Sequence, residues 1–126
     1  PLNFEPISVL IVDDDETVGR LLARCCDGPD FKVIDVVADR ASALAAVADH
    51  DPDVVLIDQR LGRESGVSVA GELLALAPAA KVIVITGDPH PDLERAAAAA
   101  GCWAVVGKTL TIAQDLPDLV RRAAAQ

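Results

Sequence analysis

The chain has 126 residues, of which 52% are hydrophobic and 25% are charged, a balance typical of one globular domain rather than a disordered chain. Its formal net charge of −9 opposes direct binding of nucleic acid by this domain, and no apolar run approaches the ~20 residues of a membrane span. The three cysteines are an odd number and the N-terminus has no signal-peptide pattern, so we expect one cytoplasmic domain, residues 1–126, without a disulfide framework.

Apolar runs alternate with helical patterns along the chain. After the first run, Asp13-Asp14-Asp15-Glu16 lead into an amphipathic helix with an acidic first turn. Residues 54–58 combine four apolar residues without alternation and a final acid, which indicates a strand buried on both faces. Strands are expected at 7–12, 31–37, 54–58, 81–86 and 103–106. Helices are expected from Thr17 to the Gly28-Pro29 break and at 41–48, 66–77, 92–100 and 116–124, with Pro117 in the first turn of the last one and a polar loop at 59–65.

This alternation of five strands and five helices predicts an α/β fold in which helices cover both faces of a parallel sheet. Right-handed crossovers favour the flavodoxin-like, doubly wound strand order 2-1-3-4-5. Its switch point lies between the first and third strands, which end in Asp13-Asp14 and Asp58. Because ligands of open α/β sheets bind outside such strand ends, we expect the functional site there.

Three carboxylates at one rim repel one another and raise each other's pKa values unless something compensates their charge. Oxygen ligands of this kind suit Mg²⁺, which takes one or two carboxylates and keeps waters, leaving room for a phosphoryl oxygen. The fourth strand adds the Thr86 hydroxyl, and the fifth adds the Lys108 ammonium, which can meet a phosphate as a point charge. These groups suit an anionic group held on Asp58 better than they suit proton abstraction.

The motifs Val12-Asp13-Asp14-Asp15, Asp58, Thr86-Gly87 and Lys108 resemble, in order and separation, those of the receiver domain of bacterial two-component response regulators. The resemblance covers about residues 7–124 and implies a phosphoacceptor rather than an enzyme, with a sensor histidine kinase as the partner. Residues 31–58 further resemble receivers that precede a LuxR-type helix-turn-helix domain. That likeness implies control of transcription through a DNA-binding output domain or a downstream protein, with homodimerisation on phosphorylation among the outcomes.

The resemblance also implies a role for each site residue. Asp58 accepts the phosphoryl group from the kinase's histidine, Thr86 bonds a phosphoryl oxygen, and Lys108 pairs with the acyl phosphate. For Mg²⁺ it implies four ligands: the carboxylates of Asp14 and Asp58, the Asp13 carboxylate mainly through water, and the backbone carbonyl of Arg60.

Three positions depart from the family pattern. Gly62 stands where proline is usual, Val105 where an aromatic switch residue is usual, and Thr109 where proline commonly follows the lysine. We therefore expect a looser loop at Gly62 and no coupling by rotation of an aromatic ring at Val105. We expect a trans peptide before Thr109, since a non-proline cis bond costs ~3–4 kcal/mol. The departures motivate an alternative, a phosphorylation-independent pseudo-receiver that acts as a protein-interaction module.

Two other classes compete less well. A Mg²⁺-dependent phosphohydrolase resembling the α/β class needs a second acid two residues after its nucleophile, where this chain has Arg60. Gly107-Lys108-Thr109 mimics the end of a nucleotide-binding P-loop, but that motif requires glycine where Cys102 stands. The acidic run after the first strand, taken alone, also fits a simple helix start.

Overall fold

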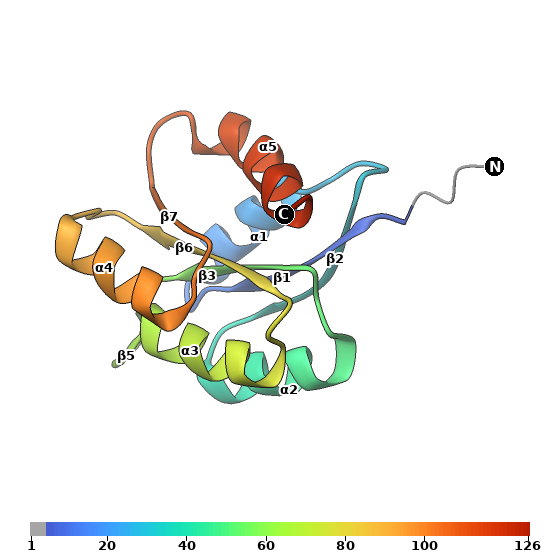
Figure 1. The fold of residues 1–126 in the computed structure, drawn as a ribbon. Helices are drawn as coiled ribbons and strands as arrows, with labels where there is room; N and C mark the ends of the chain where they lie inside the picture. Colours follow the sequence, from blue (N-terminus) through green and yellow to red (C-terminus); the bar gives the residue numbers. More distant parts are fainter. Residues whose placement is uncertain (1–4) are drawn as a thin grey trace.

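The structure, a computed structural model, describes residues 5–126, so the first four residues of the predicted domain lie outside the described residues. Five parallel strands form one sheet in the order β2-β1-β3-β6-β7 (Figure 1). In chain order this is 2-1-3-4-5, so the predicted flavodoxin-like α/β topology is confirmed. The strands are β1 (Ile7–Val12), β2 (Phe31–Val37), β3 (Val54–Asp58), β6 (Lys81–Thr86) and β7 (Ala104–Gly107).

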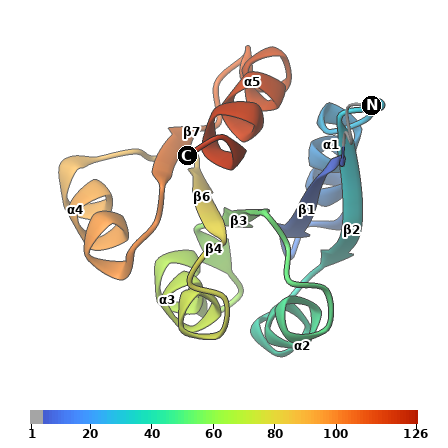
Figure 2. The ribbon, with the colours of Figure 1, turned by 45° about the vertical axis from the view of Figure 1, so that its right-hand side comes forward.

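Helices cover both faces of this sheet, as expected. Figure 2 shows α1 and α5 on one face and α2 and α3 on the other, with α4 near the β7 edge. The helices are α1 (Glu16–Cys25), α2 (Arg40–His50), α3 (Gly66–Leu76), α4 (Pro91–Ala100) and α5 (Ile112–Ala124). Within residues 5–126, none of them combines the length and the apolar character needed to cross a membrane.

The two faces of the sheet form two separate apolar cores. Alternate residues of β3 supply both, because Val55 and Ile57 pack toward α2 and α3 while Val54 and Leu56 pack toward α1 and α5. All five residues of β3 are buried, which explains why its sequence shows no polar alternation. Burial of apolar side chains on both faces stabilises the central strand and holds its last residue, Asp58, at a defined place.

Helix ends follow the signals in the sequence. Asp15 caps α1 by accepting hydrogen bonds from the N–H groups of Thr17 and Val18 at 3.0 and 3.1 Å. Gly101 ends α4 in the left-handed conformation, with φ 91°. Asp51 also adopts positive φ after α2, next to Pro52, which cannot continue the helix.

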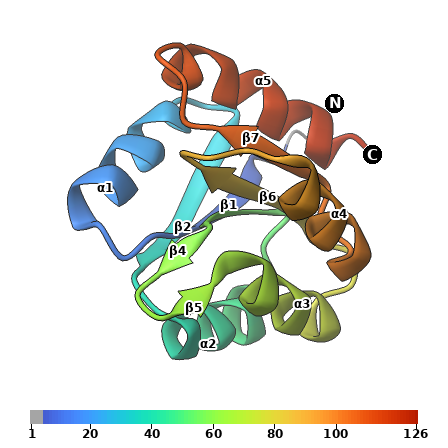
Figure 3. The ribbon, with the colours of Figure 1, turned by 90° about the vertical axis from the view of Figure 1, so that its left-hand side faces the viewer.

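The predicted polar loop at 59–65 is instead a small antiparallel hairpin. Strands β4 (Arg60–Leu61) and β5 (Glu64–Ser65) pair across a two-residue turn, and both are labelled in Figure 3. Gly62 has φ 61° and Arg63 has no positive φ, the pattern of a type II′ turn, which takes glycine at its first central position. Two-residue strands are too short for an alternating pattern, so only the glycine could have signalled this hairpin.

The last helix begins earlier than the predicted residue 116. The Thr111 carbonyl accepts hydrogen bonds from the N–H groups of Gln114 and Asp115 at 2.9 and 3.0 Å, so the first turn starts at Ile112. Pro117 consequently lies inside α5 rather than in its first turn. Proline removes one hydrogen bond of the helix and crowds the carbonyl four residues earlier, but the burial of Leu116 and Val120 outweighs this loss.

Gly66 allows the start of α3 to approach the end of β3 very closely. A Cβ atom at this position would lie 2.3 Å from the carbonyl oxygen of Asp58 and 2.9 Å from Cα of Gln59. The Gly66 N–H also donates to the Gln59 carbonyl at 2.8 Å. A side chain at residue 66 would therefore displace the backbone that carries Asp58.

We predict that Gly66→Ala lowers the free energy of unfolding by about 1–3 kcal/mol, because backbone atoms must move to admit the methyl group. Urea denaturation would measure the change. Gly71→Ala in the same helix is the matched control, since its Cβ would lie 4.0 Å from Cβ of Ala100, an ordinary contact. That control should stabilise α3 by about 0.5–1 kcal/mol, and equal effects of the two variants would contradict the prediction.

Candidate functional site

Strand pairing brings the predicted site residues to one edge of the sheet. Val12 of β1 lies opposite Ile57 of β3, so the residues that follow them, Asp13 and Asp58, are neighbours. Thr86 of β6 lies opposite Gly107 of β7, and Lys108 follows directly. Because the strands are parallel, all of these residues leave the sheet at its carboxyl edge.

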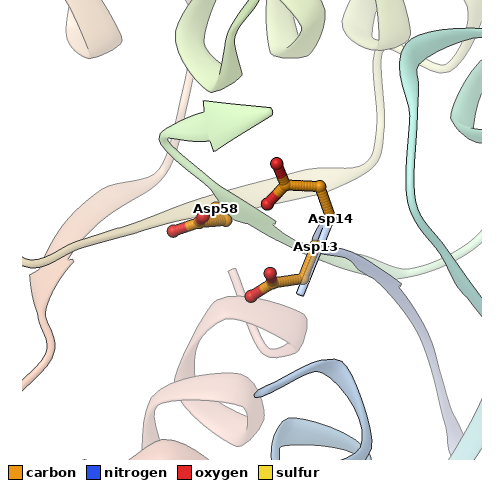
Figure 4. A group of neighbouring side chains, drawn as sticks. All are labelled: Asp13, Asp14 and Asp58. Atoms are coloured by element: carbon orange, nitrogen blue, oxygen red, sulfur yellow. The ribbon is translucent and has the colours of Figure 1, made fainter. Parts of the chain in front are cut away.

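The carboxylates of Asp13, Asp14 and Asp58 form a compact cluster. One oxygen from each lies within 4.8 Å of the others, and Figure 4 shows the side chains extending from the ends of β1 and β3. Asp13 and Asp58 are buried, with 2% and 6% of their surface exposed, whereas Asp14 is exposed. The structure therefore brings together the three carboxylates that the sequence predicted.

Thr86 and Lys108 come from the ends of β6 and β7, which lie across β3 from β1 in the sheet. The Lys108 ammonium forms an ion pair with Asp58, with 2.9 Å between Nζ and Oδ1. The buried Thr86 hydroxyl oxygen accepts a hydrogen bond from the Asp88 N–H at 3.1 Å. Both side chains line the same pocket as Asp58, together with Gln59, Arg60, Gly87 and Asp88.

The pKa of Asp13 is raised in this arrangement. Burial is the main cause that raises its pKa from 3.8 to about 6, and the nearby carboxylates of Asp58 and Asp14 add to the shift. The Asp15 N–H, 2.9 Å from Oδ1 of Asp13, and the Lys108 ammonium act in the opposite direction. Oδ2 of Asp13 is buried and has no hydrogen-bond partner among residues 5–126.

This donor set fits a hard divalent cation. Three carboxylates supply oxygen ligands, and the unpartnered Oδ2 of Asp13 is a buried acceptor that a cation or its bound water would satisfy. Arg60 lies in β4 and lines the same pocket. Its backbone carbonyl as a metal ligand stays a prediction.

Sequence reasoning missed the role of Gln59. Its side-chain Nε2 donates to the Ser65 hydroxyl at 3.1 Å, and its Oε1 accepts from the Val67 N–H at 3.0 Å. The amide thus joins the end of β3 to the end of the hairpin and the start of α3. A glutamine in a polar stretch carries no local signal for such contacts, because both partners depend on how the chain folds back.

The three departures from the family pattern have distinct structural outcomes. Every peptide bond in residues 5–126 is trans, so the prediction for the bond before Thr109 is confirmed. Val105 is half-buried and packs against the core on the α2–α3–α4 side of the sheet. Gly62 lies in the turn of a paired hairpin, where the sequence had led us to expect a looser loop.

An open parallel α/β sheet with an acidic pocket at its carboxyl edge defines a flavodoxin-like domain with a candidate cation and phosphoryl site. The chain belongs to the response regulator receiver domain family, whose model matches residues 9–121. Receiver domains are in general signalling modules rather than enzymes. The likeness stated from the motifs is therefore confirmed at the level of the family.

Individual relatives agree with this assignment. The chain is 28% identical over 114 residues to the transcriptional regulatory protein PdtaR of Mycobacterium tuberculosis, covering 90% of this chain and 55% of PdtaR. The response regulator domain of Thermotoga maritima CheB has the same fold, with a TM-score of 0.86 at 23% identity over 97% of this chain and 98% of that one. A chain of the CheX–CheY–BeF3–Mg²⁺ complex from Borrelia burgdorferi gives 0.82 at 24% identity over 93% and 89%.

The chain spans about half the length of PdtaR, although the match covers 90% of this chain. What PdtaR does as a whole protein therefore does not transfer directly to this chain. The LuxR-type subfamily suggested by residues 31–58 stays a prediction.

The raised pKa of Asp13 predicts a pH-dependent stability in metal-free buffer. Between about pH 4 and pH 6 the folded chain retains a proton on Asp13 that the unfolded chain has lost, so the free energy of unfolding falls as pH rises through this range. At pH 7 we expect the ionised Asp13 to lower the free energy of unfolding by about 1–3 kcal/mol, and Asp13→Asn should restore this amount. Denaturation of both proteins from pH 4 to pH 7 in the presence of a chelator measures the difference.

Asp35→Asn, which removes an exposed acid of β2 away from the cluster, is the control for the change in net charge. Stability curves of wild type and Asp13→Asn that run parallel over this pH range would contradict the assignment.

Proposed function

We propose that this domain accepts a phosphoryl group on Asp58 from a phosphohistidine of a partner kinase. The observation that carries the proposal is the Asp58 environment, where Lys108 lies on one side and the carboxylates of Asp13 and Asp14 on the other. A nucleophilic carboxylate needs a cation near the phosphoryl oxygens, and this pocket supplies one ammonium and a cluster suited to a second cation.

The transfer is a displacement at phosphorus. A carboxylate oxygen of Asp58 forms the new O–P bond as the N–P bond to the kinase imidazole breaks. The bonding electron pair returns to the ring nitrogen, and Asp58 becomes an aspartyl phosphate. With acetyl phosphate as the donor, the bond that breaks is the P–O bond to the acetyl group, and acetate leaves.

Lys108 and Thr86 stabilise the transferred group. In the described state the Lys108 ammonium neutralises Asp58, and it can pair with a phosphoryl oxygen once the carboxylate is esterified. The Thr86 hydroxyl accepts the Asp88 N–H and keeps its own proton for donation to a phosphoryl oxygen.

Mg²⁺ is the proposed cofactor. Asp14 and Asp58 would hold it directly, Asp13 mainly through water, and the Arg60 carbonyl would complete the protein ligands. Bound there, it supplies positive charge to the phosphoryl oxygens. The Borrelia burgdorferi structure with the same fold is described as a Mg²⁺ complex, which supports the choice of metal.

The proposed partners follow from the family. A sensor histidine kinase supplies the phosphoryl group, and a DNA-binding output domain or a downstream protein receives the signal, with transcription as the regulated process. The similarity to the transcriptional regulatory protein PdtaR supports this reading. We propose that residues 1–126 are a single cytoplasmic receiver domain and that its net charge of −9 leaves DNA contact to another domain.

The pseudo-receiver remains the alternative function. Val105 favours it, because a half-buried valine has no ring that could rotate between two positions. The two functions differ in a direct chemical readout, since only a phosphoacceptor becomes covalently modified.

Incubation with acetyl phosphate and Mg²⁺ should add one phosphoryl group to the wild-type chain, detected as a shift in intact mass. Asp58→Asn should remove the shift, because its amide is not a nucleophile for phosphorus. Omission of Mg²⁺ should reduce the extent of labelling by about 10-fold or more, as the carboxylate cluster then repels the donor.

Asp88→Asn is a matched control in the same pocket, since it is outside the proposed nucleophile and metal ligands and keeps its backbone N–H for Thr86. It should still be labelled. Labelling of Asp58→Asn to the wild-type extent would refute Asp58 as the acceptor, and an unlabelled wild type that also fails to bind Mg²⁺ would favour the pseudo-receiver.

A further inference from the structure

The β4–β5 hairpin touches the carboxylate cluster at one point. The backbone N–H of Gly62, in the hairpin turn, donates a hydrogen bond to Oδ2 of Asp14 at 2.9 Å. The two residues are 48 positions apart in the chain, so the contact exists only in the folded domain. In Figure 4 the Asp14 carboxylate extends toward the side of the sheet where the hairpin lies.

The hairpin presents this N–H from a firmly held position. Leu61, the residue before the turn, is 5% exposed and belongs to the core on the α3 side of the sheet. Gln59 joins the base of the hairpin through hydrogen bonds to Ser65 and Val67. The turn that carries the Gly62 N–H is therefore fixed on both sides.

Glycine is needed at position 62 for its backbone and not for lack of space. A Cβ atom there would meet no atom within 4 Å, but the residue has φ 61°, which most side chains disfavour. A proline would lack the N–H and would require φ near −65°. The departure from the family's proline thus introduces a hydrogen bond to a carboxylate that proline cannot make.

The hydrogen bond restricts the rotamers of Asp14 more than it would restrict those of a buried neighbour. Asp13 and Asp58 are buried and confined by packing, whereas the exposed Asp14 side chain is free to adopt other rotamers. A hydrogen bond to one carboxylate oxygen leaves lone pairs for a cation, because an ionised carboxylate can accept several bonds.

We propose that Gly62 is a positioning residue that uses its backbone N–H to hold the Asp14 carboxylate ready for a divalent cation. This inference rests on the proposed function in one respect, that the acidic cluster binds Mg²⁺. The hydrogen bond removes rotamers of Asp14 before the metal arrives, so metal binding costs less conformational entropy. The position of the Asp14 carboxylate thereby depends on the position of the hairpin turn.

Two substitutions differ in whether they keep the N–H and the positive φ of the turn. Gly62→Pro removes the donor, whereas Gly62→Asn retains it in a residue type that tolerates positive φ and has room for its side chain. Gly28→Pro is the matched control, because Gly28 also has positive φ and donates its N–H to a carboxylate, that of Asp27 at 2.9 Å, but precedes β2 at the opposite end of the sheet.

Titration of the purified domain with Mg²⁺, followed by amide NMR shifts, gives the dissociation constant without any phosphorylation. We expect Gly62→Pro to weaken Mg²⁺ binding about threefold to tenfold. Gly62→Asn and Gly28→Pro should stay within about twofold of wild type, since each leaves the Asp14 hydrogen bond in place. Unchanged binding by Gly62→Pro, or equal weakening by Gly62→Asn, would overturn the proposal.

A second measurement on the wild type guards against a variant that does not fold. The Gly62 amide proton should exchange with solvent more slowly than in an unstructured peptide, with and without Mg²⁺, and exchange at the unstructured rate would overturn the proposal. Failure of the proposed function looks different, because the wild type itself would then not bind Mg²⁺.

Discussion

Repulsion among three carboxylates held within 4.8 Å of one another is the constraint on which this domain is built. One ammonium, that of Lys108, neutralises only Asp58 directly, so the remaining charge falls on Asp13 and Asp14. Burial, together with the neighbouring carboxylates, raises the pKa of Asp13 to about 6, and its Oδ2 has no hydrogen-bond partner in residues 5–126. A carboxylate cluster of this kind is unfavourable without a cation, so a cation bound there would raise the free energy of unfolding.

The fold tolerates this repulsion because the carboxylates lie outside the two apolar cores. Val54, Val55, Leu56 and Ile57 bury their side chains completely on the two faces of the sheet, and the acids appear only where the strands end. The doubly wound topology then brings strand ends from distant parts of the chain to one edge. The apolar strand residues thus stabilise the fold, and the polar residues at the carboxyl ends of the strands form the site.

Several contacts hold the backbone around Asp58 and the carboxylate of Asp14. Gly66 packs against the Asp58 carbonyl, Gln59 joins β3 to the hairpin and α3, and the Gly62 N–H reaches Asp14. These contacts connect the ends of β1 and β3 to the β4–β5 hairpin and to α3. They do not involve an aromatic side chain at position 105, where the half-buried valine offers no ring to move.

The sequence alone determined the topology and the chemical content of the site. Apolar runs without alternation revealed the buried strands, and a polar or acidic residue after each of four runs marked the shared edge, because parallel strands all end on the same side. Only the tertiary structure decided the hairpin within residues 59–65, the start of α5 before Pro117, and the contacts of Gln59 and Gly62. These features depend on backbone dihedral angles and on hydrogen bonds between residues far apart in the chain, and neither leaves a periodic pattern of residue types for the sequence to display.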